Sequence, residues 1–329
     1  MAHSTKLTKN EMLIINKLEL DSRTPFSKFK GKIRKSQQAI SYTVNTLLKK
    51  RIIQKFYTLI DYSKLDVINF RVYFKLSYFN EKKFDELIDY MSLDPHISWI
   101  SMCGGRYDLI CSFLALNPSQ FNKTLKSLIA KFPTQIQNYN VLTTIVIRWF
   151  GRKYLSKEMP DQIIFGGDRA PEEIDEIDIK ILNELSEDAR KSSVKIGKNL
   201  SITPKTIIQR IKRLYNAKII RGFKPLLNIR KMGYISNLLL IRYHNVSPEL
   251  ENKLISYLKA QPNVVSIVKT LGEWDIEVKI ETKDPMEFRK IEMQIRQKFT
   301  SLIQQIESVP LYKTYKKNYF PKFLIETKR

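Results

Sequence analysis

The sequence predicts an α+β protein made of two tandem repeats, each a three-helix domain followed by a β-α-β-β-α-β domain. The first observation is that equivalent residues recur at a constant offset along the whole chain, as Asp188 follows Asp21 by 167 positions. The second is that the hydrophobic residues of each repeat have helical spacing in its first part. In its second part they alternate with polar residues or form short continuous runs, as in strands. Gly, Pro and Asp keep the offset without a gap, which indicates a duplicated unit; the matched pairs include Pro95 with Pro262, Gly105 with Gly272, Asp108 with Asp275 and Pro118 with Pro285.

The duplication sets the expected domain boundaries. Between the repeats, Pro160, Gly166, Gly167 and Pro171 punctuate a segment of mixed charge, which is typical of a linker. We therefore expect two three-helix domains, over residues 6–60 and 172–228, and two α/β domains, over residues 66–150 and 234–320. Residues 151–171 are expected to form the linker.

The three helices are clearest in the second repeat, where residues 172–185, 193–199 and 204–216 have amphipathic spacing. Thr203 is a good N-cap for the last helix and Pro204 a good first helical residue. That helix is apolar on one face and cationic or amide-bearing on the other, as in the recognition helix of a helix-turn-helix domain. Arg and Lys suit guanine edges and phosphates, and Gln suits adenine, so the predicted DNA contacts are Lys205, Thr206, Gln209, Lys212 and Arg213.

Residues 219–223 follow as a short strand, which we interpret as the wing of a winged helix-turn-helix domain. Arg221, with Lys218 and Lys224, is expected to face DNA phosphates there. A small helical domain with a solvated polar face is the alternative to DNA binding for this whole part of the repeat.

The first repeat places a different surface at the equivalent helix. The offset of 167 puts Gln38, Ala39, Tyr42, Asn45 and Thr46 on its outward face, so the cations of the second copy are missing. Basic residues before and after the helix compensate in part, and they are Lys28, Lys30, Lys32, Arg34, Lys35, Lys49, Lys50, Arg51 and Lys55. We expect an asymmetric DNA site in which the second copy dominates and Gln38, Tyr42, Asn45, Thr46 and Lys35 make the contacts of the first.

The remainder of each repeat predicts a ferredoxin-like domain. In the second copy, strands are expected over 236–243, 264–271, 274–280 and 303–312, with helices over 248–260 and 286–299. The first copy has the same order over residues 70–147.

Composition narrows the function. Lys and Arg number 57 against 33 Asp and Glu, a formal net charge of +24, which points to a polyanionic partner, either nucleic acid or an anionic membrane surface. A merely Lys-rich, solvated surface is the alternative. No segment approaches the roughly 18 uninterrupted apolar residues of a membrane span, and residues 1–10 lack the apolar core of a signal peptide. Cys103 and Cys111 form no disulfide framework, and the three histidines have no metal-ligand spacing. We expect a cytoplasmic, nucleoid-associated protein with no metal, no cofactor and no membrane partner.

The order of these motifs resembles the Lrp/AsnC (feast/famine) family of bacterial and archaeal transcriptional regulators. The matching segments are Ile174 to Asp178, Asp188-Ala189-Arg190, Leu200 to Pro204, Arg210 to Leu214, Ile219 to Phe223, and the Gly272-Glu273-Trp274-Asp275 turn. The resemblance implies a non-enzymatic regulator whose α/β domains pair into dimers and often into larger oligomers. It also implies an amino-acid-like effector near the turn, at Gly105, Tyr107 and Asp108 and at Gly272, Trp274 and Asp275. Ordinary hairpin and core roles are the alternative for these six residues.

Two units in one chain depart from the usual single unit. The simplest inference is an intrachain pseudo-dimer of the two α/β domains, with further homo-oligomers; pairing between chains is the alternative. Siroheme decarboxylases resemble the same family and also join two units, but the scattered His96 and His244 do not resemble a tetrapyrrole site. A ligand-binding or assembly module with degenerate DNA binding is the remaining alternative.

Overall fold

The computed structural model describes residues 6–29, 33, 35–77, 80–156, 158, 162–244 and 247–327. Each repeat contains the predicted β-α-β-β-α-β domain, which confirms the fold class. The first consists of β2 (Ile68–Leu76), α3 (Glu81–Leu93), β3 (Ile97–Cys103), β4 (Leu109–Ala115), α4 (Pro118–Lys131) and β5 (Ile136–Trp149). The second consists of β8 (Ile235–Tyr243), α8 (Pro248–Ala260), β9 (Val264–Leu271), β10 (Ile276–Thr282), α9 (Pro285–Lys298) and β11 (Ile303–Lys317).

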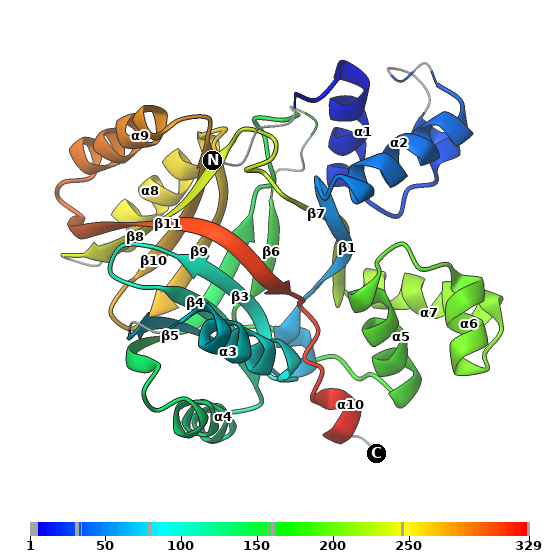
Figure 1. Ribbon diagram of the computed structural model, residues 1–329, viewed down its shortest axis with the longest axis horizontal. Coiled ribbons are helices and arrows are strands. Elements are labelled where there is room, and N and C mark those ends of the chain that lie inside the picture. The colour runs from blue at the N-terminus through cyan, green and yellow to red at the C-terminus, as the bar shows by residue number, and fades with distance from the viewer. Residues whose placement is uncertain are drawn as a thin grey trace.

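The two antiparallel sheets, with strand orders β5-β2-β4-β3 and β11-β8-β10-β9, join at both edges. Strand β3 pairs with β11, and β5 pairs with β9. Because β2 also pairs with β5, the strands close into a ring that leaves neither sheet with a free edge. The linker adds β6 (Ile163–Gly166), which pairs with the end of β5. Figure 1 shows the helices of both domains on the outside of this barrel.

Alternation along the barrel strands gives each sheet an outer and an inner face. On β10, Ile276, Val278 and Ile280 pack outward against α8 and α9, whereas Glu277 and Lys279 point the other way into the barrel. One end of the interior is an apolar cluster that includes Tyr73, Tyr107, Leu240 and Trp274. The other end is polar and adjoins the helical domains.

The helical domains are α1 (Lys9–Leu20), η1 (Phe26–Phe29) and α2 (Gln37–Lys49) in the first repeat, and α5 (Glu176–Glu187), α6 (Ser193–Leu200) and α7 (Pro204–Asn216) in the second. Thr203 caps α7 as expected. Helix α5 begins four residues later than predicted, because Asp175 is its N-cap and forms a capping box with Asp178. Within α6, a Cβ on Gly197 would lie 2.4 Å from the carbonyl oxygen of Ile202 in the turn before α7, so the close approach of this turn to α6 requires glycine.

The predicted wing is wrong. Strand β7 (Ile220–Leu227) does not project toward DNA but pairs antiparallel with β1 (Ile53–Ile60) of the other repeat, forming a two-stranded ribbon. Helix α1 packs on β7, and α5 packs on β1. The Ser22 N–H donates to the Phe223 carbonyl (2.9 Å), and the Ala189 N–H donates to the Phe56 carbonyl (3.1 Å).

These two bonds join residues that the offset of 167 interchanges, so a pseudo-twofold axis relates the repeats. Tyr57 pairs with Lys224 at the centre of the ribbon, and this pair also obeys the offset. Short helices η2 (Tyr62–Leu65) and α10 (Leu324–Thr327) complete the described elements. Within the described residues, no helix is both long and apolar enough to cross a membrane.

Candidate nucleic-acid interface and internal cavity

Helix α7 presents a cationic face to solvent. Lys205, Gln209 and Lys212 are exposed, and in the described part of the chain neither lysine has a carboxylate within ion-pair distance. Ile208 and Tyr215 flank this face and are 57% and 52% exposed. Amide and ammonium groups beside exposed apolar side chains can contact base edges, phosphates and thymine methyl groups together.

Two of the predicted contacts on α7 are engaged within the protein. The Arg213 guanidinium pairs with Asp178 at the start of α5, although the arginine side chain remains 54% exposed. The Thr206 hydroxyl lies 2.8 Å from that of Thr203 in the N-cap. Arg213 must therefore give up or share its carboxylate to bind a phosphate, whereas Lys205 and Lys212 need not.

The equivalent helix of the first repeat, α2, exposes a neutral polar face. Gln38, Asn45 and Lys35 are exposed, and Tyr42 is 75% exposed. The Thr46 hydroxyl donates to the Tyr42 carbonyl at 2.9 Å, so Thr46 is half-buried along the helix. Lys28 is exposed before the helix, whereas Lys30, Lys32 and Arg34 lie outside the described residues.

The ribbon corrects the expected role of Lys224. Its side chain is buried, and its ammonium group donates to the carbonyls of Glu19 (2.6 Å) and Leu20 (2.8 Å) at the end of α1. Burial lowers the pKa of Lys224 to about 8, although nearby carboxylates act in the opposite direction. Lys224 therefore fastens the ribbon to α1 and faces no phosphate. Arg221 is half-buried on the same strand, and burial lowers its pKa.

The six residues of the two hairpin turns serve the fold. Tyr107 and Trp274 are buried in the apolar end of the barrel. Asp108 and Asp275 accept backbone N–H groups of Leu76 (2.8 Å) and Tyr243 (2.7 Å). Gly105 and Gly272 have positive φ angles of 86° and 148°. None of the six lines the internal cavity described next.

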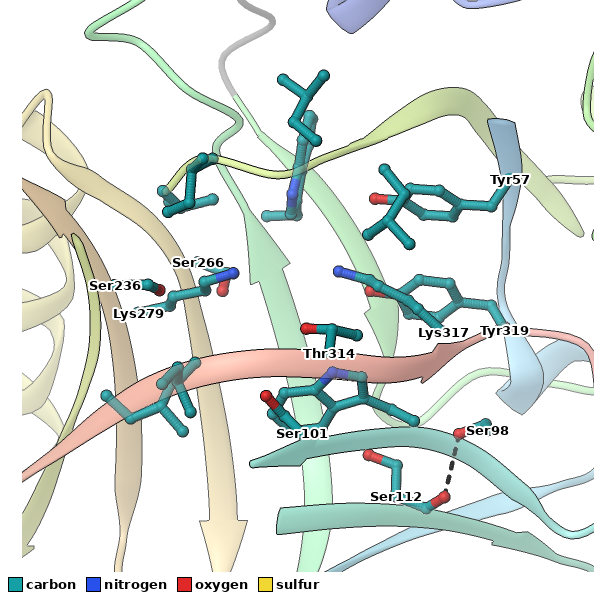
Figure 2. Close-up of a pocket in the computed structure, with 18 of the residues that line it drawn as sticks. Tyr57, Ser98, Ser101, Ser112, Ser236, Ser266, Lys279, Thr314, Lys317 and Tyr319 are labelled. Carbon is teal, nitrogen blue, oxygen red and sulfur yellow. Dashed lines mark hydrogen bonds between the residues drawn. The ribbon is translucent and has the colours of Figure 1, made fainter. Parts of the chain in front are cut away.

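The polar end of the barrel encloses a cavity of about 460 Å³ between both sheets and the ribbon. Serines from four strands line it, and Lys279 and Lys317 reach into it from opposite sides (Figure 2). Tyr57 of the ribbon and Tyr319 after β11 border it, with the Lys317 ammonium 5.3 and 5.8 Å from their ring centres. The cavity is therefore built from both repeats and touches the element that joins the two helix-turn-helix domains.

A buried ion network lies at one wall of the cavity. The Arg152 guanidinium contacts Glu281 and Glu19, each at 2.8 Å, and the Tyr154 hydroxyl donates to Glu281 at 2.5 Å. Burial alone would raise the pKa of Glu281, but Arg152 and Lys279 lower it to about 2. Glu19 belongs to α1, so the network links the barrel to the first helical domain.

Electrostatics distinguish the two lysines of the cavity. Lys279 lies 3.2 Å from Glu281, and burial lowers its pKa. Burial followed by the proximity of Arg152 lowers the pKa of Lys317 to about 8, against the opposing influence of Glu281. Among the described residues, Lys317 has no carboxylate within 4 Å. Of the two lysines that reach into the cavity from opposite sides, Lys317 is the less compensated.

Sequence reasoning missed these residues, although the signal was present. Glu277, Lys279 and Glu281 alternate with isoleucine and valine on β10, which predicts a half-buried strand with one solvated face. That face turns inward because the second sheet closes the barrel over it. Only the pairing of the two repeats converts the expected solvent-facing side into a cavity wall.

Comparisons with known proteins agree with this architecture. Residues 174–215 match the AsnC-type helix-turn-helix domain. The chain is 35% identical over 102 residues to the HTH-type transcriptional regulator Ptr1 of Methanocaldococcus jannaschii, covering 31% of this chain and 68% of Ptr1. It is 30% identical over 118 residues to the regulatory protein AsnC of Haemophilus influenzae, covering 36% of this chain and 78% of AsnC.

Both matches have about the length of one repeat. Over both repeats, the fold is similar to the crystal structure of the siroheme decarboxylase NirDL, with a TM-score of 0.62, 12% identity, and coverage of 97% of this chain and 98% of NirDL. The latter likeness concerns the fold alone, whereas the sequence matches extend over most of the relatives. The chain therefore belongs to the Lrp/AsnC family.

Proposed function

We propose that the protein is a sequence-specific regulator of transcription that binds double-stranded DNA, mainly through its second helix-turn-helix domain. The observation that carries the proposal is the exposed face of α7, where Lys205, Gln209 and Lys212 stand together. The relatives Ptr1 and AsnC, both named as regulators, support the same function. Such a protein would act at the nucleoid in the cytoplasm.

The two helix-turn-helix domains are proposed to contribute unequally. The α2 face offers Gln38, Tyr42 and Asn45, which can bond to bases or stack but attract phosphates weakly. Lys35 lies just before that helix and supplies one cation. We therefore expect a bipartite DNA site with two different halves, rather than the palindrome that a symmetric dimer would read.

The two α/β domains of one chain are proposed to replace the usual dimer. Support comes from the strand pairs β3–β11 and β5–β9, which use the edges that a partner subunit would otherwise occupy. Larger homo-oligomers and modulation by a small effector complete the proposal. The ribbon gives a route for modulation, because it lines the cavity and carries both helical domains.

A tetrapyrrole enzyme is the second candidate, favoured by the fold-level likeness to NirDL over the whole chain. Against it, neither histidine in the described part of the chain lines the cavity. His96 is half-buried and stacks on Phe323, with ring centres 4.4 Å apart, and His244 is exposed at the end of β8. The absorption spectrum of the purified protein after incubation with an iron tetrapyrrole separates the candidates, because specific binding would give a shifted, saturable Soret band.

The test of the main proposal is fluorescence anisotropy with a labelled duplex from upstream of the protein's own gene, compared with random duplex from 50 to 200 mM salt. A regulator should show a steep negative salt dependence and prefer the upstream duplex by at least about 10³-fold. Steep salt dependence without preference would indicate an architectural DNA-binding protein. Absence of binding at low salt would refute the DNA-binding function.

A further inference from the structure

The internal cavity carries an uncompensated positive charge. Four of the cations that line it, Arg71, Arg152, Lys279 and Lys317, lie beside three buried carboxylates, Glu19, Glu277 and Glu281, and Arg230, Lys231 and Lys313 add further positive charge at its border. Arg71 lies 3.5 Å from Glu277. Arg152 forms ion pairs with Glu19 and Glu281, and Lys279 forms a second ion pair with Glu281. Among these four cations, the remaining positive charge is that of Lys317. A half-buried cation that faces a cavity without a counter-ion is poorly solvated, so the cavity favours an anion beside it.

Polar atoms that line the cavity also lack partners within the described protein. Asn69 Oδ1, Ser236 Oγ and the Tyr62 hydroxyl are buried and make no hydrogen bond. Buried polar groups are almost always hydrogen-bonded in folded proteins. Several orphaned groups around one cavity therefore indicate a polar occupant.

The walls of the cavity fix the shape of that occupant. Trp99 and Trp149 line it together with Tyr57 and Tyr319, so flat apolar surfaces border the charged groups. A volume of about 460 Å³ lies in the range of small-molecule sites. An aromatic or otherwise planar body matches these walls, with its charged group toward the two lysines that Figure 2 shows extending toward one another.

The pseudo-twofold axis shows that the charges belong to this tandem chain. The offset of 167 relates six charged residues of the cavity walls to uncharged ones. Lys279 corresponds to Ser112, Lys317 to Phe150, Arg152 to Tyr319, Arg71 to Leu238, Glu281 to Leu114 and Glu277 to Ile110. In a symmetric dimer each charge would occur twice near the axis. Here each occurs once, which gives a single polar site of defined orientation.

We propose that this cavity binds one small organic anion with a planar apolar body, its charged group held between Lys279 and Lys317. The site differs in place and chemistry from the hairpin turns that the sequence suggested for an effector. The regulatory role of this site rests on the DNA-binding function proposed above. Ligand binding at the site is independent of that function and can be measured on the protein alone.

The probe for the test is 8-anilinonaphthalene-1-sulfonate, a planar aromatic anion, titrated into the full chain and followed by dye fluorescence excited through the tryptophans. We expect saturable binding of one dye per chain, with energy transfer from Trp99 and Trp149. The uncharged analogue N-phenyl-1-naphthylamine should bind at least about tenfold more weakly. Absence of saturable binding, or equal affinity for the uncharged analogue, would overturn the proposal.

Variants locate the dye. K279M and K317M, which keep side-chain length and remove the charge, should each weaken dye binding at least about tenfold, and K317R should retain it. K316M is the matched control, because Lys316 neighbours Lys317 on β11, has a pKa that burial also lowers to about 8, and does not line the cavity. Equal loss in K316M, or no loss in the K279M/K317M double variant, would place the dye elsewhere and refute the assignment. Thermal melts of each variant exclude simple unfolding as the cause of a loss.

Displacement of the dye identifies the anionic group. Indole-3-acetate and phenyl phosphate carry a carboxylate and a phosphate on aromatic bodies of similar size. Displacement by either supports the site and distinguishes the two chemistries. If neither displaces the dye at 10-fold molar excess over the dye, binding of aromatic carboxylates and phosphates at this site is refuted. A failed DNA-binding experiment with successful displacement would leave this binding site standing and remove only its proposed regulatory role.

Discussion

Removing Lys205 and Lys212 from α7 should flatten the salt dependence of DNA binding by a predictable amount. Both ammonium groups are exposed, and in the described part of the chain neither has a carboxylate to compete with a phosphate. Each phosphate contact contributes about 0.9 to the slope of log K against log salt concentration, so the K205A/K212A variant should lose about 1.8. Between 50 and 200 mM salt, the wild type should then lose about 12-fold more affinity than the variant.

The same geometry predicts a different result for Arg213. Because its guanidinium already pairs with Asp178, R213A should change the slope by less than one phosphate contact. The assay is fluorescence anisotropy with one duplex at four or more salt concentrations.

The control for net charge is K123A/K126A on α4, where both lysines are exposed on the outer side of the barrel. Both double variants lower the net charge by two, so a general charge effect would change their slopes equally. An unchanged slope for K205A/K212A, or the same change in the control, would refute the assignment of α7 as the main DNA contact.

Four further predictions concern the contact of Gly197, the ion network and the cavity. G197A should reduce DNA affinity while barrel unfolding changes little, because the new Cβ would meet the Ile202 carbonyl; backbone amide exchange of the two domains checks this. R152M should lower the free energy of unfolding by about 3–5 kcal/mol in urea, since it leaves a buried carboxylate unpaired. The pKa of Glu281 lies at about 2, below its ordinary 4.5, so its contribution to the free energy of unfolding is complete above pH 4.5 and is lost as the pH falls toward 2. The E281Q variant should therefore show a smaller loss of the free energy of unfolding over this pH range. Dye affinity should fall as the pH rises through about 8, where Lys317 loses its proton in the empty cavity, and K317R should remove this step.

Local patterns predicted most elements of the fold. Helix caps such as Thr203 and the alternation on β10 act within a few residues, so a single sequence reveals them. The offset of 167 revealed the duplication. It also makes the strand pair β3–β11 equivalent to the strand pair β9–β5. Helix α5 started late because the acidic residues of the expected first turn include the capping Asp175.

Features that depend on the contact of the two repeats could not be predicted in this way. The strand read as a wing is β7, whose Lys224 looks like a phosphate contact until β1 pairs with it and α1 covers its ammonium group. Likewise, Lys279 and Lys317 lie 38 residues apart on two predicted strands. The sequence predicts that both strands belong to a sheet, but not which element covers the face that carries these lysines. Long-range pairing determines which polar face meets solvent and which closes over a cavity.

The tandem arrangement removes a constraint that symmetry imposes on a dimer. On a true twofold axis, any charged residue faces its own copy, and like charges in a buried place repel strongly. Covalent duplication allows Tyr57 to stand opposite Lys224 and Ser112 to correspond to Lys279, so the axis can carry charge without self-repulsion. The same freedom lets α2 and α7 present different surfaces. Because the ribbon borders the cavity and fastens to α1 through Lys224, an asymmetric ligand would act from one site on both proposed DNA-binding helices, which a symmetric homodimer cannot do with a single ligand.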